Sequence, residues 1–173
     1  MSKSASEPKI LLDADVTRHF IQASKQLYLP KIYPHRLVMI DIVKNELCRS
    51  KWLKTPVENF IDCCKIELLT INNNIEVQKE YATLKKQFDD GESACMALAK
   101  FEKQYIASSN LRDIRNYCEI NGITYLTTSD ILLDALLKGI MTPEECNEMI
   151  KINIAKGSKF PFLTIEEFAL SKK

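Results

Sequence analysis

The amino-acid sequence predicts an α/β protein of three layers, α/β/α, with a central, mostly parallel sheet and helices on both faces. Short apolar runs alternate along the chain with segments of helical periodicity, which is typical of strand–helix–strand units. The first apolar run ends directly on a carboxylate and a helical pattern follows, as expected for a buried strand of such a sheet. The 173 residues are 46% hydrophobic and 27% charged, which is ordinary for one globular domain.

The first strand and helix are predicted within Ile10–Phe20 (ILLDADVTRHF). Helical spacing continues to Leu27, and we expect the helix to end before Leu29-Pro30, because a residue that precedes proline disfavours the helical conformation. Residues 1–9 are small and polar and are expected to form a flexible arm. No linker or repeat interrupts the remainder, so residues 10–173 are predicted to form a single domain.

The middle of the chain continues the alternation of strands and helices. Strands are predicted at Arg36–Ile40 and Ile66–Ile71. Asp41 is expected to cap a helix that carries Glu46, and Pro56 to open the next one. Apolar residues at helical spacing then predict a helix that Gly91 breaks, after which a new helix runs over Glu92–Phe101; the spaced residues are Val77, Tyr81, Leu84 and Phe88.

The C-terminal third has clear helix boundaries. A strand at Tyr105–Ser108 is followed by a helix over Leu111–Asn121 that Gly122 closes, and a strand at Ile123–Leu126 comes next. Two more helices are predicted, one with Ser129 as its N-cap that ends at Gly139, and one opened by Thr142-Pro143 that runs to about Gly157. The tail is expected to form one more short element.

Acidic and amide side chains fall where predicted strands end or helices begin. Because the carboxyl ends of parallel strands share one edge of a sheet, these side chains are expected to converge there: Asp13, Glu46, Glu92, Asn110 and Asp130. Clustered carboxylates repel one another, and a divalent cation such as Mg²⁺ or Mn²⁺ removes the conflict. Such an ion activates water and stabilises the leaving oxygen in phosphodiester hydrolysis.

Structural roles compete with this chemistry at several of the acids. Asp15 and Asp41 serve equally well as helix caps, and Asp130 fits the first turn of a helix better than a catalytic role. Glu46 has polar neighbours and is explained as well by a solvated helix face. Asp13 differs from these residues, because a carboxylate next to a buried strand is costly unless it is paired or liganded.

Four motifs in order, LLDADV, NEL, GESACMALA and SSNLRDIR, resemble those of the PIN domain, a family of metal-dependent ribonucleases. The resemblance is greatest to the bacterial branch with a GEA-type third motif, and it covers the chain from Ile10 to about Gly157. It implies catalytic roles for Asp13, Glu46 and Glu92, with Asn110 at the position of a fourth acid. It also implies Asp13, Glu92 and Asn110 as ligands of Mg²⁺ or Mn²⁺. Ser108 matches a small hydroxyl residue of the fourth motif, and Asp15 and Asp130 are candidate supporting acids.

Asn110 departs from the family pattern, which has an aspartate there. Asparagine keeps an oxygen ligand but removes one negative charge, so the resemblance implies weaker binding of Mg²⁺. Asp113 or Asp130 are candidates to supply the missing charge. Three interpretations stay open: a weakened but working endoribonuclease, a non-catalytic module that binds RNA or protein, and an inactivated copy of a toxic enzyme.

Basic side chains flank the acidic motifs and are expected to form a rim that binds RNA phosphates, with Lys44, Arg49, Arg112 and Arg115 as the candidate contacts. A formal net charge of +1 excludes a histone-type binder. The resemblance further implies an antitoxin-like protein partner, as in a toxin–antitoxin pair, and a homodimer. Six cysteines without a CxxC pair, together with the lack of a signal peptide or a membrane-length apolar run, indicate the reducing cytoplasm and no membrane contact.

Overall fold

The computed structural model describes residues 7–173 and confirms the predicted α/β class. Its five parallel strands form one central sheet in the order β3-β2-β1-β4-β5. They are β1 (Ile10–Leu12), β2 (Leu37–Ile40), β3 (Glu67–Leu69), β4 (Tyr105–Ala107) and β5 (Tyr125–Leu126). β1 lies in the middle of the sheet and is fully buried, which explains why all three of its side chains are apolar.

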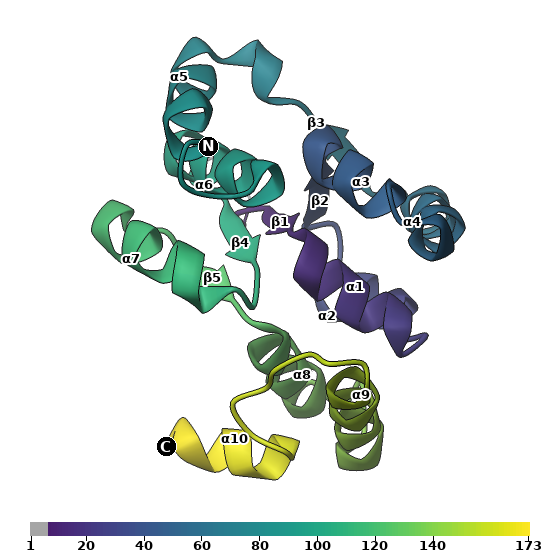
Figure 1. Cartoon of the computed structure of the whole chain (residues 1–173). Helices are drawn as coiled ribbons and strands as arrows, with labels where there is room; N and C mark the ends of the chain where they lie inside the picture. Colours follow the sequence, from purple (N-terminus) through teal and green to yellow (C-terminus); the bar gives the residue numbers. More distant parts are fainter. Residues whose placement is uncertain (1–6) are drawn as a thin grey trace, which may run out of the picture.

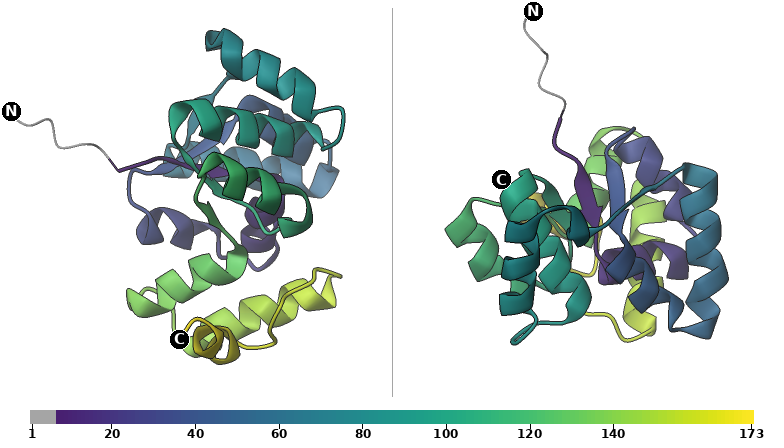
Figure 2. Two further views of the ribbon diagram at one scale, coloured as in Figure 1. Left: turned by 90° about the vertical axis from the view of Figure 1, so that its left-hand side faces the viewer. Right: turned by 90° about the horizontal axis from the view of Figure 1, so that it is seen from above.

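Ten α-helices surround this sheet within residues 7–173. They are α1 (Ala14–Gln22), α2 (Leu29–Ile32), α3 (Asp41–Cys48), α4 (Lys51–Cys64), α5 (Ile75–Leu84), α6 (Asp90–Glu102), α7 (Leu111–Asn121), α8 (Thr128–Leu137), α9 (Pro143–Ala155) and α10 (Ile165–Ser171). Figure 1 shows α5, α6 and α7 on one side of the strands and α1, α3 and α4 on the other. Helices α8, α9 and α10 contact one another and form a group at one end of the molecule (Figure 2).

The sheet register places the ends of β1 and β4 side by side. Leu12 is the partner of Ala107, and the N–H of Asp13 donates to the Ala107 carbonyl oxygen at 3.0 Å. The residues that follow these two strands, Asp13 and Ser108, therefore begin at the same edge of the sheet. This edge is where α/β sheets generally carry their ligand sites.

The predicted N-terminal arm falls partly outside the described residues, which begin at residue 7. Residues 7–9 are bound to the domain: the Lys9 carbonyl accepts from the Tyr105 N–H at 2.8 Å, and the Pro8 carbonyl accepts from Arg36 Nε at 2.9 Å. The Glu7 carboxylate also pairs with Arg36 at 3.3 Å, so the chain is tied to the domain from three residues before β1.

The first helix is shorter than predicted. It ends at Gln22, and Ser24 turns the chain in a left-handed conformation, with φ of 56°. The Lys25 N–H then donates to the Phe20 carbonyl at 2.8 Å, which closes the helix without a glycine. A short 3-10 helix follows, and Leu29-Pro30 begins α2 rather than ending α1, because proline is tolerated in a first helical turn.

Three predicted helix starts are also corrected. Helix α4 begins at Lys51, and Pro56 lies inside it, where the buried neighbours Leu53 and Val57 keep that face packed on the core. Helix α6 begins at Asp90, so Gly91 belongs to its first turn. Helix α8 is capped by Thr127 rather than Ser129, because a capping box pairs the cap with the acid three residues later, Asp130.

Other boundaries are confirmed. Helix α7 spans Leu111–Asn121, and Gly122 ends it in a left-handed conformation, with φ of 63°. Helix α9 begins at Pro143 with a capping box between Thr142 and Glu145. No helix within residues 7–173 has the length and apolar character needed to cross a bilayer.

Candidate functional site

The candidate site is built around Asp13, at the carboxyl edge of β1. Asp13 is the N-cap of α1, and its Oδ1 accepts from the Ala14 N–H at 2.8 Å. The Thr17 hydroxyl donates to the Asp13 carbonyl at 2.9 Å, which fixes the first helical turn. The residue is only 3% exposed. A carboxylate is thus held at the end of the central strand almost without solvent.

Glu92 reaches the same place from the first turn of α6. It is 8% exposed, and its Oε1 accepts a hydrogen bond from the Asn110 side-chain amide. Its Oε2 is buried without a hydrogen-bond partner among residues 7–173. Burial raises the pKa of Glu92 to about 7. One oxygen of this side chain is therefore free to accept a ligand. While it has no partner, its burial costs the folded protein free energy.

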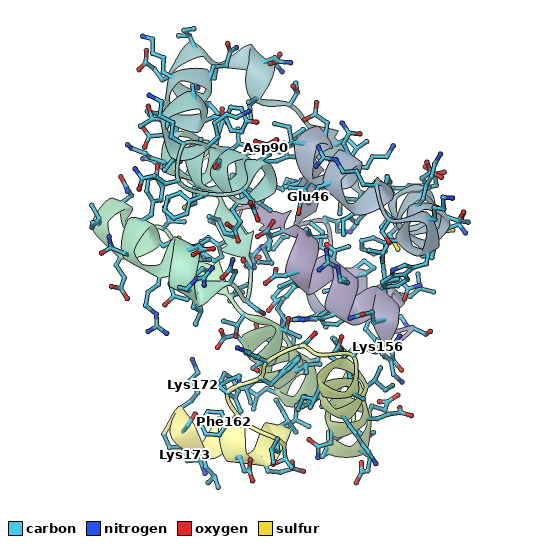
Figure 3. The ribbon with its side chains drawn as sticks, in the orientation of Figure 1. Glu46, Asp90, Lys156, Phe162, Lys172 and Lys173 are labelled. Atoms are coloured by element: carbon cyan, nitrogen blue, oxygen red, sulfur yellow. The ribbon has the colours of Figure 1, made fainter. Side chains whose placement is uncertain are left out.

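Glu46 approaches from α3 across Gly91. A Cβ atom built on Gly91 would lie 2.5 Å from Glu46 Oε2 and 3.6 Å from Asp13 Oδ1. The missing side chain thus leaves the space in which the Glu46 carboxylate comes near Asp13. Burial and the Asp89 carboxylate raise the pKa of Glu46. Figure 3 shows Glu46 and Asp90 close together between α3 and α6, and both line one open pocket.

We call Asp13, Asp15, Glu46 and Glu92 the acid centre. Burial raises the pKa of Asp13 well above its usual range, and the neighbouring Asp15 and Glu92 carboxylates raise it further. The Ala14 N–H and the Ser108 hydroxyl lower it in part. These carboxylates therefore repel one another when they are ionised. A cation placed among them would offset both this repulsion and the cost of burying their charge.

Asn110 uses its side chain as a donor in this structure. Its Nδ2 donates to Glu92 Oε1 and, at 2.8 Å, to Asp113 Oδ2. The amide therefore bridges two carboxylates from α6 and α7. To offer its oxygen to a metal ion, the Asn110 amide would have to turn over, and Glu92 and Asp113 would then lose their shared donor. Asp113, which the sequence offered as a substitute charge, lies beside Asn110 at the edge of the acid centre.

Asp15 and Ser108 support the edge of the sheet. Asp15 Oδ2 accepts from the Ser109 N–H at 2.7 Å, and its Oδ1 accepts from the Val16 N–H at 2.6 Å. This carboxylate therefore joins α1 to the turn after β4. Ser108 is fully buried, and its Oγ accepts from the Asn110 N–H at 3.3 Å. Both residues position the chain around Asp13.

Asp130 is used by its own helix. Its Oδ2 accepts from the Thr127 N–H at 2.9 Å and from the Thr127 hydroxyl at 2.6 Å. Its Oδ1 forms an ion pair with Lys172 at 2.9 Å. Both oxygens are thus engaged in the cap of α8 and in fastening α10, which agrees with the helix-start role weighed from the sequence.

The predicted basic residues lie at different distances from the acids. Arg49 lines the pocket that Glu46 also lines, and Arg112 lines a second pocket with Asn110. Arg115 is exposed further along α7, and Lys44 is half-buried on α3. Sequence analysis missed Arg18, an exposed residue on α1 whose charge lowers the pKa values of Asp15 and Glu46. Its position three residues after Asp15 was the available signal, because helix residues at that spacing are neighbours.

The donor set suits a hard cation held by few protein ligands. Among residues 7–173, no three His, Cys, Asp or Glu side chains lie close enough together to hold a metal ion between them. Mg²⁺ is commonly bound by one or two carboxylates, with waters and substrate phosphates completing its shell. Asp13 and the unpartnered Oε2 of Glu92 meet that requirement in residue type.

Comparison with models of known protein families finds none that matches this chain, and no curated protein matches it in sequence.

Proposed function

We propose that this protein is an endoribonuclease that hydrolyses RNA phosphodiester bonds with Mg²⁺ or Mn²⁺. The observation that supports the proposal best is the buried Oε2 of Glu92, left without a partner beside the buried Asp13. Neither carboxylate forms an ion pair within residues 7–173. A site of this kind is stable in the ionised form only with a cation, and carboxylate oxygens favour Mg²⁺ and Mn²⁺.

Each residue of the acid centre has a distinct role in this proposal. Asp13 and Glu92 would hold the ion, which supplies charge for the phosphate and an activated water. Glu46, placed across Gly91, accepts a proton from water more readily than an ordinary carboxylate because its pKa is raised. Asp15 holds the turn after β4, and Arg49 and Arg112 attract the phosphates from either side. The choice of RNA as the polymer rests on the resemblance to PIN domains.

A second candidate function is a non-catalytic module that binds RNA or protein. The position of the Asn110 amide favours it, because a donor between Glu92 and Asp113 partly replaces the charge that a cation would bring. In this alternative, the acid centre is stabilised by hydrogen bonds and by protonation of Glu92 near neutral pH. The basic rim would still bind phosphates.

A paired comparison of the wild-type protein with Asn110→Asp separates the two candidates. The added carboxylate should tighten Mn²⁺ binding by about tenfold or more, the scale on which groups around a metal site act, and should raise Mn²⁺-dependent cleavage of single-stranded RNA. Calorimetric titration with Mn²⁺ and a gel-based cleavage assay give the two readouts. The matched control is Asn116→Asp, which adds the same charge on the exposed side of α7.

The outcomes are distinct. Cleavage that depends on Mn²⁺ and is stronger in Asn110→Asp than in Asn116→Asp supports the nuclease. If neither the wild-type protein nor Asn110→Asp cleaves RNA, and RNA binding is unchanged by chelator, the nuclease proposal is lost and the binding module is favoured.

We further infer that the protein works in the reducing cytoplasm, since all six of its cysteines are free thiols. The antitoxin-like partner and the homodimer belong to the same proposal, and they rest on the family resemblance. Light scattering tests both, because it measures the mass of the particle in solution: the protein is purified alone, and again after co-expression with the products of adjacent genes.

A further inference from the structure

A pocket of about 320 Å³ lies beside the acid centre and is formed by three segments that are far apart in the sequence. The start of α7 supplies one wall, the junction of β5 and α8 supplies another, and the segment between α9 and α10 supplies the third. Asn110 lines the pocket and also donates to Glu92. The pocket therefore opens next to the place where a phosphate would be cut.

The third wall is held in place by contacts with α1. The ring of Phe160 packs against the ring of His19, with centroids 5.3 Å apart and planes tilted by 40°. His19 is fixed at both nitrogens, by the Thr128 hydroxyl at 2.8 Å and by the Ser158 hydroxyl at 3.1 Å. Thr128 is in turn 2.9 Å from the Ser109 hydroxyl, at the rim of the pocket. Figure 1 shows the α9–α10 segment returning across α8.

The lining combines apolar surface with cations. Phe160, Pro161 and Leu111 provide apolar surface, and Ser129 contributes a hydroxyl. The exposed side chains of Arg112 and Lys159 complete the lining. Proteins bind unpaired bases by stacking them on aromatic rings and by hydrogen bonds to their edges, while cations hold the adjoining phosphates. This pocket offers all three kinds of contact.

The pocket on the opposite side of the acid centre has a different character. It has a volume of about 420 Å³, and its lining consists of three carboxylates, two cations and one aromatic ring, from Glu46, Asp89, Asp90, Arg49, Lys85 and Phe88. Most of this lining is polar, so it offers much less apolar surface for the face of a base than the first pocket does. The two sides of the acid centre are therefore chemically unequal, and an RNA strand that crosses it would have a preferred side for a base.

We propose that the pocket lined by Phe160, Leu111, Ser129, Arg112 and Lys159, here called the base pocket, binds the base of an unpaired RNA nucleotide next to the phosphate at the acid centre. This inference rests on the proposed function, because it takes the acid centre as the place of cleavage. It makes single-stranded RNA the substrate class, since a base held in a duplex is stacked and paired and cannot enter.

The test is a cycle between protein and RNA, measured as binding in the presence of chelator. The wild-type protein and Phe160→Ala are each titrated with a short single-stranded RNA and with an abasic ribose-phosphate strand of equal length. Stacking of one base on an aromatic ring predicts that Phe160→Ala weakens RNA binding by roughly 5- to 150-fold and leaves binding of the abasic strand unchanged. Phe160→Trp should restore RNA binding, and Phe101→Ala, which removes an exposed ring at the far end of α6, should alter neither.

Four results decide the proposal. If Phe160→Ala weakens binding of the RNA and of the abasic strand equally, the proposal is overturned. It is also overturned if the wild-type protein binds the two strands with equal affinity, a comparison that needs no variant. A base-dependent effect in a protein that cleaves nothing with Mn²⁺ supports the base pocket while the nuclease proposal fails. If duplex and single-stranded RNA are cleaved equally fast, and the wild-type protein and Phe160→Ala cleave equally fast, the nuclease proposal is supported and the base pocket is overturned.

Discussion

Replacing Glu92 by glutamine should stabilise the metal-free protein above neutral pH while it abolishes metal binding. The pKa of Glu92 rises from 4.5 in the unfolded chain to about 7 in the folded protein. The folded state thus binds this proton more tightly, so stability falls as the pH rises from 4.5 to about 7. At 1.36 kcal/mol per pKa unit, the ionised side chain costs the fold about 3 kcal/mol above pH 7, which is an upper value for the gain in Glu92→Gln.

The substitution keeps the shape of the site. The glutamine oxygen still accepts from the Asn110 amide, and the new NH₂ group replaces the oxygen that has no partner within residues 7–173. Urea unfolding in chelator should therefore show a gain for Glu92→Gln at pH 8 that vanishes near pH 4.5. Glu102→Gln, at the exposed C-terminal end of the same helix, is the matched control.

Added Mn²⁺ should reverse the order. At one hundred times its Kd, an ion that binds only the folded state stabilises the wild-type protein by about 2.7 kcal/mol, whereas Glu92→Gln gains little. A variant that is less stable than the wild type at pH 8 in chelator would refute the reasoning. It would mean that the Glu92 carboxylate is a stabilising part of the fold rather than a strained ligand.

Two further predictions follow from the same region and its neighbour. Gly91→Ala should leave the free energy of unfolding within about 1 kcal/mol of the wild type, because alanine favours helices and only the end of the Glu46 side chain must move. Titration with Mn²⁺ should nevertheless show weaker binding by this variant. Unchanged Mn²⁺ binding would contradict the placement of Glu46. Burial lowers the pKa of His19 to about 4, so the unfolded chain binds the proton more tightly and stability is lost as the pH falls from 6.5 to 4, by up to about 3 kcal/mol. In urea unfolding, His19→Gln should flatten this dependence and His35→Asn, at the exposed histidine, should not; equal slopes in all three proteins would exclude His19 as the cause.

Local patterns predicted the elements where one short-range rule governs the outcome. Helix α7 was predicted over its full span, because apolar spacing and Gly122 define both its body and its end. The end of α1 could not be predicted in this way, because Ser24 takes a left-handed conformation at a position without glycine. A glycine after a helical pattern predicts a helix break, but Gly91 lies in the first turn of α6, where its missing side chain leaves room for Glu46 of another helix.

The sequence by itself determined the α/β class, the buried first strand and the acidic residue types at the ends of strands and the starts of helices. Only the tertiary structure decided which acids meet. Asp130 forms the capping box of α8 with Thr127, whereas Glu92 is buried and accepts a hydrogen bond from Asn110. The base pocket likewise depends on Phe160, which lies about fifty residues beyond Asn110 in the chain; its contact with His19 and the packing of α8 and α9 help to hold it there. The physical reason is that helix and strand periodicities act over a few residues, while charge, burial and pocket shape depend on segments that folding alone brings together.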